Sequence, residues 1–171
     1  MYIINNRRVE KIEAVTFSEL SMTESDLEEI IRNSIDMICD DEVSWPPLGV
    51  GRAGAFAMLI VGQQVKNEKN GRSDLTAIDN EGNIVLIEIK RDRRDIEGRK
   101  EAFEFQAIRY AASYATIEST DDLVKKVYAP YIEKHRSEFE LGELTSYELG
   151  IRILNEFLSV NEAENSFNKK Q

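Results

Sequence analysis

The chain has 171 residues and a formal net charge of −10 at pH 7, with 42% hydrophobic and 32% charged residues. This length and composition suit one domain with a substantial core. No apolar run approaches membrane-spanning length and residues 1–10 lack a signal-peptide pattern, so we expect a cytoplasmic protein without membrane contact. Cys39 is the single cysteine, which excludes an intramolecular disulfide and a thiolate zinc cluster.

Helical and strand patterns alternate along the chain and are separated by Gly, Pro and polar turn residues. Ser21 and Thr23 are both suitable N-caps for the first long helix, since acidic residues follow them. A last helical pattern either closes the core of this domain or packs on a further domain. In chain order, we expect β segments around 2–4 and 9–17, a helix over 24–38, strands over 56–65, 72–79 and 83–90, and helices over 97–115, from 120, and over 146–160.

The most informative segment is 72–90, which has the pattern of one β-hairpin. Two apolar, β-rich runs flank Asn80-Glu81-Gly82, where Gly stands at the position that needs a left-handed residue in a three-residue loop. We expect Asp79 to pair with Asn83 across this loop. This pairing fixes the register of every other residue along the two strands.

The register brings two carboxylates together. It places Asp74 opposite Glu88 and Arg72 opposite Lys90, with cross-strand Cβ atoms about 5 Å apart. Two carboxylates this close repel each other unless a cation lies between them, and hard oxygen ligands suit Mg²⁺ or Mn²⁺. A solvated face with cross-strand ion pairs is the alternative. However, the run 84–87 is apolar at every position, which favours a central strand covered on both faces.

Three features follow one another along the chain: Asp74, the tripeptide Glu88-Ile89-Lys90, and a helix with Gln106-Ala107-Ile108-Arg109-Tyr110. Together they resemble the PD-(D/E)XK nuclease superfamily. The similarity is greatest to its RecB-like branch with the QxxxY helix and to the catalytic domain of NucS-type endonucleases. It covers roughly residues 27–115, and Ser73 stands where the family name expects Pro. The resemblance implies a restriction-endonuclease-like α/β fold, in which a central mixed β-sheet is flanked by helices. We expect one such domain over residues 1–160, with its core at about 24–116, and a frayed polar tail over 161–171.

The resemblance also implies a role for each residue of the hairpin. Asp74 and Glu88 would ligate a metal ion, and the backbone carbonyl of Ile89 would add a ligand. Lys90 would orient the attacking water or stabilise the charge that develops on the phosphate. The expected cofactor is therefore Mg²⁺ or Mn²⁺.

Two helices would complete this site. Gln106 and Tyr110 match the QxxxY motif that helps to position the site in the family, and residues four apart lie on the same side of a helix. Family members also place a Glu on the helix before the sheet. Glu28 is the best match for that residue, and Glu29 and Glu24 remain open.

Charge is the main argument against a nucleic-acid partner, because a net charge of −10 repels DNA at long range. The distribution softens this objection. Residues 63–100 contain nine basic and eight acidic residues, against 13 and 24 in the rest of the chain. A solvated loop of mixed charge is the alternative for residues 91–95. The candidate nucleic-acid contacts are Lys66, Lys69, Arg72, Arg91 and Arg93.

Two isolated residues argue against nucleophilic hydrolase chemistry. Cys39 ends the apolar pattern of the first helix and is expected to be a small buried side chain. His135 lies in the charged run Glu133-Lys134-His135-Arg136 and is expected to face solvent. Neither has a recognisable partner for a Ser-His or Cys-His pair.

The chemistry of phosphodiester hydrolysis agrees with the resemblance. A carboxylate-bound divalent ion activates a water molecule and neutralises charge on the phosphate. We therefore expect a Mg²⁺-dependent nuclease, endo- or exonucleolytic, with DNA as the favoured partner. Two alternatives stay open: a non-cleaving module that binds nucleic acid or protein, and an interaction protein with acidic faces. The type of nucleic acid, its strandedness, a further domain and a homo-oligomer also stay open.

Overall fold

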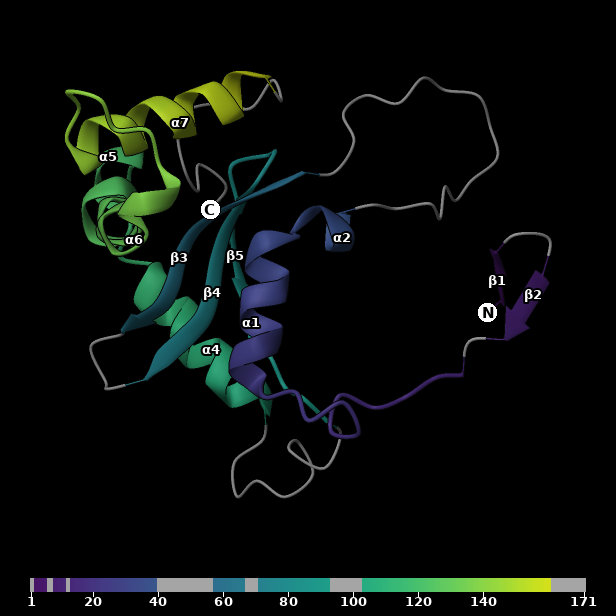
Figure 1. Ribbon diagram of the computed structural model, residues 1–171. Helices are drawn as coiled ribbons and strands as arrows, with labels where there is room; N and C mark the ends of the chain where they lie inside the picture. The colour runs from purple at the N-terminus through teal and green to yellow at the C-terminus, as the bar shows by residue number, and fades with distance from the viewer. Residues whose placement is uncertain are drawn as a thin grey trace, which may run out of the picture.

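The computed structural model describes residues 2–5, 8–11, 13–39, 57–66, 71–92 and 103–160 (Figure 1). It is a mixed α/β structure. In chain order, the elements are β1 (Tyr2–Asn5), β2 (Arg8–Lys11), α1 (Glu24–Asn33), α2 (Asp36–Cys39), β3 (Met58–Lys66), β4 (Arg72–Asp79), β5 (Ile84–Ile87), α4 (Phe103–Tyr114), α5 (Thr120–Leu123), the π turn η1 (Val124–Tyr128), α6 (Ala129–Lys134), the 3-10 turn η2 (Arg136–Glu138) and α7 (Ser146–Val160).

The first long helix is capped and terminated by its own sequence. Thr23 is the N-cap, and it forms a capping box in which its side chain and that of Asp26 each bind the other residue's backbone N–H. The helix expected over 24–38 is divided, because Ser34 leaves helical geometry and separates α1 from the short α2. Cys39, at the end of α2, is buried as expected.

The main sheet has the strand order β3-β4-β5, and β1 and β2 form a separate two-stranded sheet. Both pairings in the main sheet are antiparallel, so the mixed sheet expected from the sequence is not present among the described residues. Short connections join consecutive strands antiparallel, whereas a parallel neighbour requires a long crossover. The order also makes β5 an edge strand of this sheet, half-buried along its length, and β4 the central one. The expectation that 84–87 is central was therefore wrong.

The hairpin itself is confirmed. Gly82 has φ of 82°, and its N–H donates to the Asp79 carbonyl oxygen, while the Asp79 N–H donates to the Asn83 carbonyl oxygen. The ladder then runs from Ile78 opposite Ile84 to Leu75 opposite Ile87, which is the predicted register. Strand β5 ends at Ile87, so the tripeptide 88–90 continues beyond the ladder.

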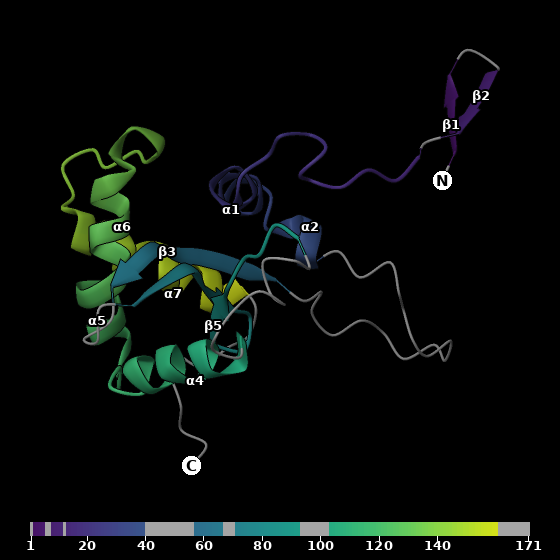
Figure 2. The same cartoon turned by 90° about the horizontal axis from the view of Figure 1, so that it is seen from below.

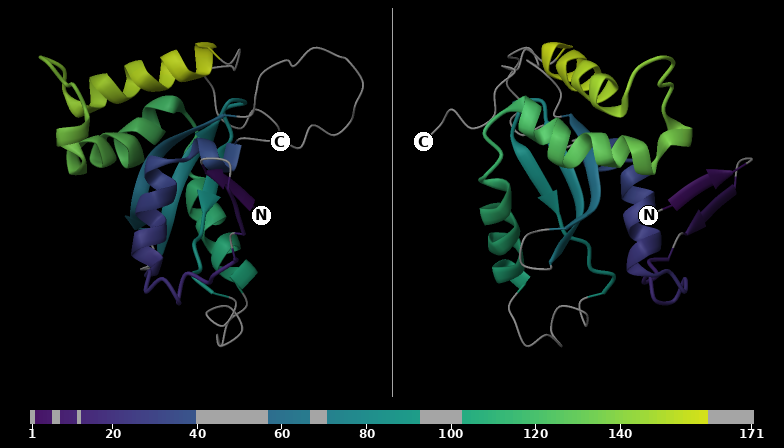
Figure 3. Two further views of the ribbon diagram at one scale, coloured as in Figure 1. Left: turned by 45° about the vertical axis from the view of Figure 1, so that its right-hand side comes forward. Right: turned by 90° about the vertical axis from the view of Figure 1, so that its left-hand side faces the viewer.

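Helices cover both faces of the main sheet. Figure 2 shows α1 on one side of the strands and α4 on the other, and the right-hand view of Figure 3 shows the same order. Helix α7 closes the core of this domain, one of the two alternatives that its pattern left open, because its leucines are buried with the strands and with α5, η1 and α6. The fully buried apolar side chains include Val61, Leu75, Ile78, Leu123, Ile132, Leu149, Leu154 and Leu158. Within the described ranges, no helix is long and apolar enough to cross a membrane.

A buried hydroxyl cluster joins α4 to β4. The Tyr114 hydroxyl lies 2.7 Å from Thr76 Oγ1 and 3.3 Å from Ser73 Oγ, and all three side chains are buried. Tyr114→Phe leaves the two strand hydroxyls with only each other, so we expect it to lower the free energy of unfolding by about 1–2 kcal/mol. Urea unfolding measures this. Tyr147→Phe is the matched control, since Tyr147 donates to the half-exposed Asp121 and water can replace it. Equal losses in both variants would contradict the prediction.

Candidate functional site

A pocket of about 400 Å³ lies where α1 faces the end of β3 and the start of β4. Its acidic wall consists of Glu24, Glu28 and Glu29 from α1 and Asp74 from β4. These carboxylates include every acidic residue that the sequence suggested for the helix before the sheet. The rest of the wall is neutral or basic, and it comes from Ser25 of α1, from β3 and from the end of α6.

The backbone of β3 presents two consecutive side chains to this pocket. Successive residues of a regular strand point to opposite faces. Gln64, however, has φ of 54°, a left-handed conformation that costs a non-glycine residue roughly 1–2 kcal/mol. Gln63 and Gln64 both line the pocket and both donate to glutamates of α1. The local distortion of β3 thus coincides with the pocket.

Gln64 connects Asp74 to Glu28. Its Nε2 donates to Glu28 Oε2 at 2.6 Å and to Asp74 Oδ1 at 3.2 Å. The other Asp74 oxygen accepts the backbone N–H of Ile89 at 2.8 Å, just beyond the end of the β4–β5 ladder. The Glu28 side chain is buried. Two carboxylates from distant segments are therefore joined by the side-chain amide of Gln64.

The Lys90 ammonium lies among the oxygens that the sequence suggested as metal ligands. Nζ is 2.9 Å from Glu88 Oε1 and 2.6 Å from the Ile89 carbonyl oxygen. It is also 3.9 Å from Asp74 Oδ2 and from Glu24 Oε2. The Lys90 side chain is only 6% exposed. The cation expected between Asp74 and Glu88 is thus, in this structure, the amine of the same motif.

The donor chemistry of this cluster fits a hard divalent cation, because it offers carboxylates and a backbone carbonyl. Its present arrangement does not hold one directly: among the described residues, no three His, Cys, Asp or Glu side chains are grouped for metal ligation. The Lys90 ammonium and N–H donors engage Asp74, Glu88 and the Ile89 carbonyl. A metal ion would therefore have to displace Lys90, whose flexible four-carbon stem permits such a movement.

The QxxxY residues lie on α4. Tyr110 is buried, and it is not among the residues that line the pocket. The Gln106 side chain lies outside the described part of the structure. Because α4 covers the face of the sheet opposite α1 (Figure 2), a role for either residue at the site stays a prediction.

The candidate nucleic-acid contacts have different positions. Lys66 and Arg72 are exposed and pair in register where β3 meets β4. Arg91 forms an ion pair with Asp92 at 3.0 Å. Lys69 and Arg93 lie outside the described residues. None of these placements tests a contact with nucleic acid.

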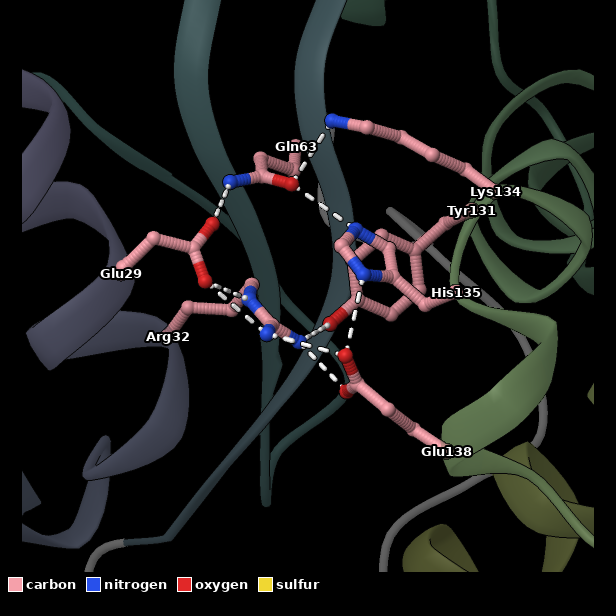
Figure 4. Close-up of polar contacts among 7 residues, drawn as sticks. All are labelled: Glu29, Arg32, Gln63, Tyr131, Lys134, His135 and Glu138. Atoms are coloured by element: carbon pink, nitrogen blue, oxygen red, sulfur yellow. Dashed lines mark hydrogen bonds and ion pairs between the residues drawn. The ribbon is translucent and has the colours of Figure 1, made fainter.

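A second polar network lies beside the cluster, and Figure 4 shows it as a closed ring. Gln63 Nε2 donates to Glu29, and its Oε1 is 2.8 Å from His135 Nε2. His135 Nδ1 is 3.2 Å from Glu138 Oε1, and Arg32 joins Glu138 back to Glu29. His135 is only 11% exposed, so the expectation that it faces solvent was wrong. Its partner is 72 positions earlier in the chain, which local sequence patterns do not reveal.

The pocket residues that the sequence did not indicate are Ser25, Gln63, Gln64, Lys134 and His135. One signal was available for the two glutamines, because they interrupt the apolar pattern of the first core strand. No such signal exists for Lys134 and His135, since they come from a short helix after the region of resemblance. Comparison with known proteins adds no further residues. Neither the protein-family models nor the curated proteins include a match to this chain, and no solved structure matches its fold.

Arg32 lowers the pKa of two carboxyls in the ring. Its hydrogen bonds hold the pKa of Glu138 below the usual 4.5. For Glu29, burial raises the pKa, but hydrogen bonds from Arg32 and Gln63 outweigh it and the net shift is downward. The Arg32 side chain is 7% exposed, whereas both glutamates are about half exposed. The network therefore joins α1 to the end of α6 most strongly when both carboxylates are ionised.

We expect Arg32→Met to destabilise the protein by about 1–2 kcal/mol near pH 7, discounted for the exposure of the glutamates. In the wild type, the pKa values of both carboxyls are lower in the folded protein than in the unfolded chain. As the pH is lowered, the unfolded chain therefore binds protons at a higher pH than the folded protein does. The stability of the folded protein consequently falls below pH 4.5. The Arg32→Met variant lacks this contribution. The difference in unfolding free energy between the wild type and the variant should therefore be smaller near pH 3 than near pH 7. Urea unfolding at both pH values measures it, and a difference that is independent of pH would contradict the assignment.

Proposed function

We propose that this chain is a metal-dependent nuclease that hydrolyses nucleic-acid phosphodiester bonds, with DNA as the favoured substrate and a restriction-endonuclease-like core. One observation carries the proposal. The Lys90 ammonium lies within 4 Å of oxygens of Asp74, Glu88 and Ile89, which are the ligands that the resemblance implies. Glu28 joins the same cluster through Gln64.

In this proposal, Asp74, Glu88 and the Ile89 carbonyl hold Mg²⁺ or Mn²⁺. The bound ion supplies an activated water molecule and a Lewis acid for the phosphate. Asp74 is oriented for this role by the Ile89 N–H and by Gln64, so its position is fixed by the hairpin and by β3 together. Lys90, once it leaves the ligand oxygens, places its ammonium where negative charge develops on the phosphate.

A non-cleaving binding module is the second candidate. The observation that favours it is the present pairing of Lys90 with Glu88 and with the Ile89 carbonyl, which places a positive charge among the carboxylates without a metal ion. An amine in this position stabilises the fold in the way that a structural ion pair does. The two candidates differ in whether a divalent ion displaces that amine.

A cleavage assay tests the proposal directly. Single-stranded, double-stranded and branched DNA, together with the corresponding RNA, are incubated with the protein and Mg²⁺, Mn²⁺ or EDTA. We expect cleavage that requires the metal and that disappears in Asp74→Ala and Lys90→Ala. No cleavage of any substrate, with no increase in melting temperature on addition of Mn²⁺, would favour the binding module.

A further inference from the structure

The pocket has a basic end that the proposed reaction has not used. Lys134, the last residue of α6, lines the pocket opposite the glutamates of α1. Its Nζ lies 2.7 Å from Gln63 Oε1. Among the described residues, this neutral oxygen is the polar contact of Lys134, and no carboxylate pairs with it. Lys125 and Lys126 on the preceding turn, by contrast, each pair with an Asp.

The position of this ammonium is fixed by the polar ring. Gln63 directs its NH₂ to Glu29, so its carbonyl oxygen faces Lys134 and His135 (Figure 4). The His135 ring packs against Tyr131, with 4.7 Å between the ring centroids, and it lines the pocket together with Lys134. A lysine ammonium has three N–H donors, and one of them serves Gln63. Two donors therefore remain for a ligand, since the exposed Lys134 side chain lines the pocket.

The ligand chemistry follows from the charges of the pocket. Its acidic wall suits a cation, whereas a lysine held by a neutral amide suits an anion with several acceptor oxygens, such as a phosphate. Gln63 and Gln64 are consecutive, so the basic end lies beside the cluster around Asp74. A nucleic-acid strand carries phosphates at regular intervals along its backbone, and phosphate contacts fix the position of a protein on the strand.

We propose that Lys134, positioned by Gln63 and His135, forms a phosphate-binding subsite that takes a strand phosphate adjacent to the one that is cleaved. This inference rests on the proposed function. The subsite gives the strand a cationic contact across the pocket from the acidic wall, and it sets which phosphate reaches Asp74 and Lys90. Lys134 binds substrate in this scheme, whereas Gln63 and His135 are positioning residues.

Binding of a fluorescein-labelled single-stranded DNA oligonucleotide tests the subsite by fluorescence anisotropy, with Ca²⁺ in place of Mg²⁺. We expect Lys134→Met to weaken binding about tenfold and to reduce the slope of log K against log salt by about 0.7, the value for one phosphate contact on a single strand. Lys126→Met is the matched control, because it removes the same charge from an exposed helix position outside the pocket. Equal weakening by both variants would overturn the subsite.

Gln63→Glu provides an independent variant with an intact Lys134. It keeps the shape of the side chain but gives the ammonium a carboxylate partner and removes the N–H donor to Glu29, so binding should weaken by a similar factor. Asn155→Asp on α7 adds the same negative charge outside the pocket and should leave the affinity within about twofold. If the two acidic variants bind alike, Gln63 does not position Lys134.

A set of oligonucleotides, each with one neutral methylphosphonate linkage, identifies the phosphate. At one position, the methylphosphonate should weaken binding to the wild type but should not weaken binding to Lys134→Met any further. The reason is that the neutral linkage and the Lys134 substitution remove the same contact. Additive effects at every position would overturn the assignment. Where cleavage is measurable, Lys134→Met should raise KM about tenfold and keep kcat within about twofold.

These results separate the subsite from the reaction. If binding depends on Lys134 but no substrate is cleaved, the subsite is supported and the nuclease proposal is rejected. If the protein cleaves DNA but Lys134→Met and Lys126→Met bind the oligonucleotide equally well, the nuclease proposal is supported and the subsite is rejected. No oligonucleotide binding at all would reject the subsite directly.

Discussion

Replacing Lys90 with Met should tighten Mn²⁺ binding about tenfold or more while slowing cleavage by about 100- to 1,000-fold. The first effect arises because the ammonium competes with the metal for Asp74, Glu88 and the Ile89 carbonyl. A hydrogen bond to a charged group contributes about 1.5–3 kcal/mol, which corresponds to at least about a tenfold change in affinity. The second effect follows from the loss of a positive charge where the phosphate becomes more negative.

The two readouts are independent. Mn²⁺ affinity is measured by calorimetry without substrate, and cleavage is measured at saturating Mn²⁺. Lys125→Met serves as the control, since Lys125 pairs with Asp121 on an exposed turn and lies outside the pocket. It should change neither quantity by more than about twofold. If Mn²⁺ bound more weakly to Lys90→Met than to the wild type, the ammonium would not be a competitor of the metal.

Asp74→Asn should abolish metal binding and should lower the cleavage rate by at least about 1,000-fold, while the protein stays folded. The asparagine keeps an oxygen that can accept the Ile89 N–H, but it loses the negative charge that a divalent ion requires. Urea unfolding, Mn²⁺ titration and single-turnover cleavage are measured on the same preparation. A folded variant that cleaves within tenfold of the wild type would remove Asp74 from the site.

The same strand offers a matched control for this variant. Asp79 is another carboxylate of β4 and is buried, but it accepts backbone N–H groups from Glu81 and Asn83 in the hairpin loop. Asp79→Asn should cost about 1 kcal/mol of stability and leave cleavage and Mn²⁺ binding unchanged. Loss of cleavage in both variants would indicate that disruption of the hairpin, and not loss of a ligand, explains the result for Asp74.

The sequence was sufficient for the features that local chemistry controls. The loop glycine at 82 determines the hairpin, and the pairing of Asp79 with Asn83 determines its register down to Leu75 opposite Ile87. Asp74 and Lys90 are brought together because each lies within a few residues of that ladder. Thr23 likewise caps α1 through residues that are adjacent in the sequence.

Long-range packing decided what the sequence did not reveal. The apolar run 84–87 suggested a central strand, yet the sheet described here ends at β5. A run of four apolar residues is equally compatible with an edge strand that helices cover. His135 was expected in solvent because its neighbours are charged, but its environment is set by Gln63 and Glu138 from other elements. The left-handed backbone at Gln64 also has no sequence signal, since Gln is not a residue that favours it.

Direct titration with Mn²⁺, monitored by the electron paramagnetic resonance signal of the free ion, tests the central claim most directly. We predict saturable binding to the wild type that is lost in Asp74→Asn, retained in Asp79→Asn and tighter in Lys90→Met. Absence of saturable binding to the wild type, or binding that Asp74→Asn leaves unchanged, would contradict the metal site around Asp74, Glu88 and Lys90.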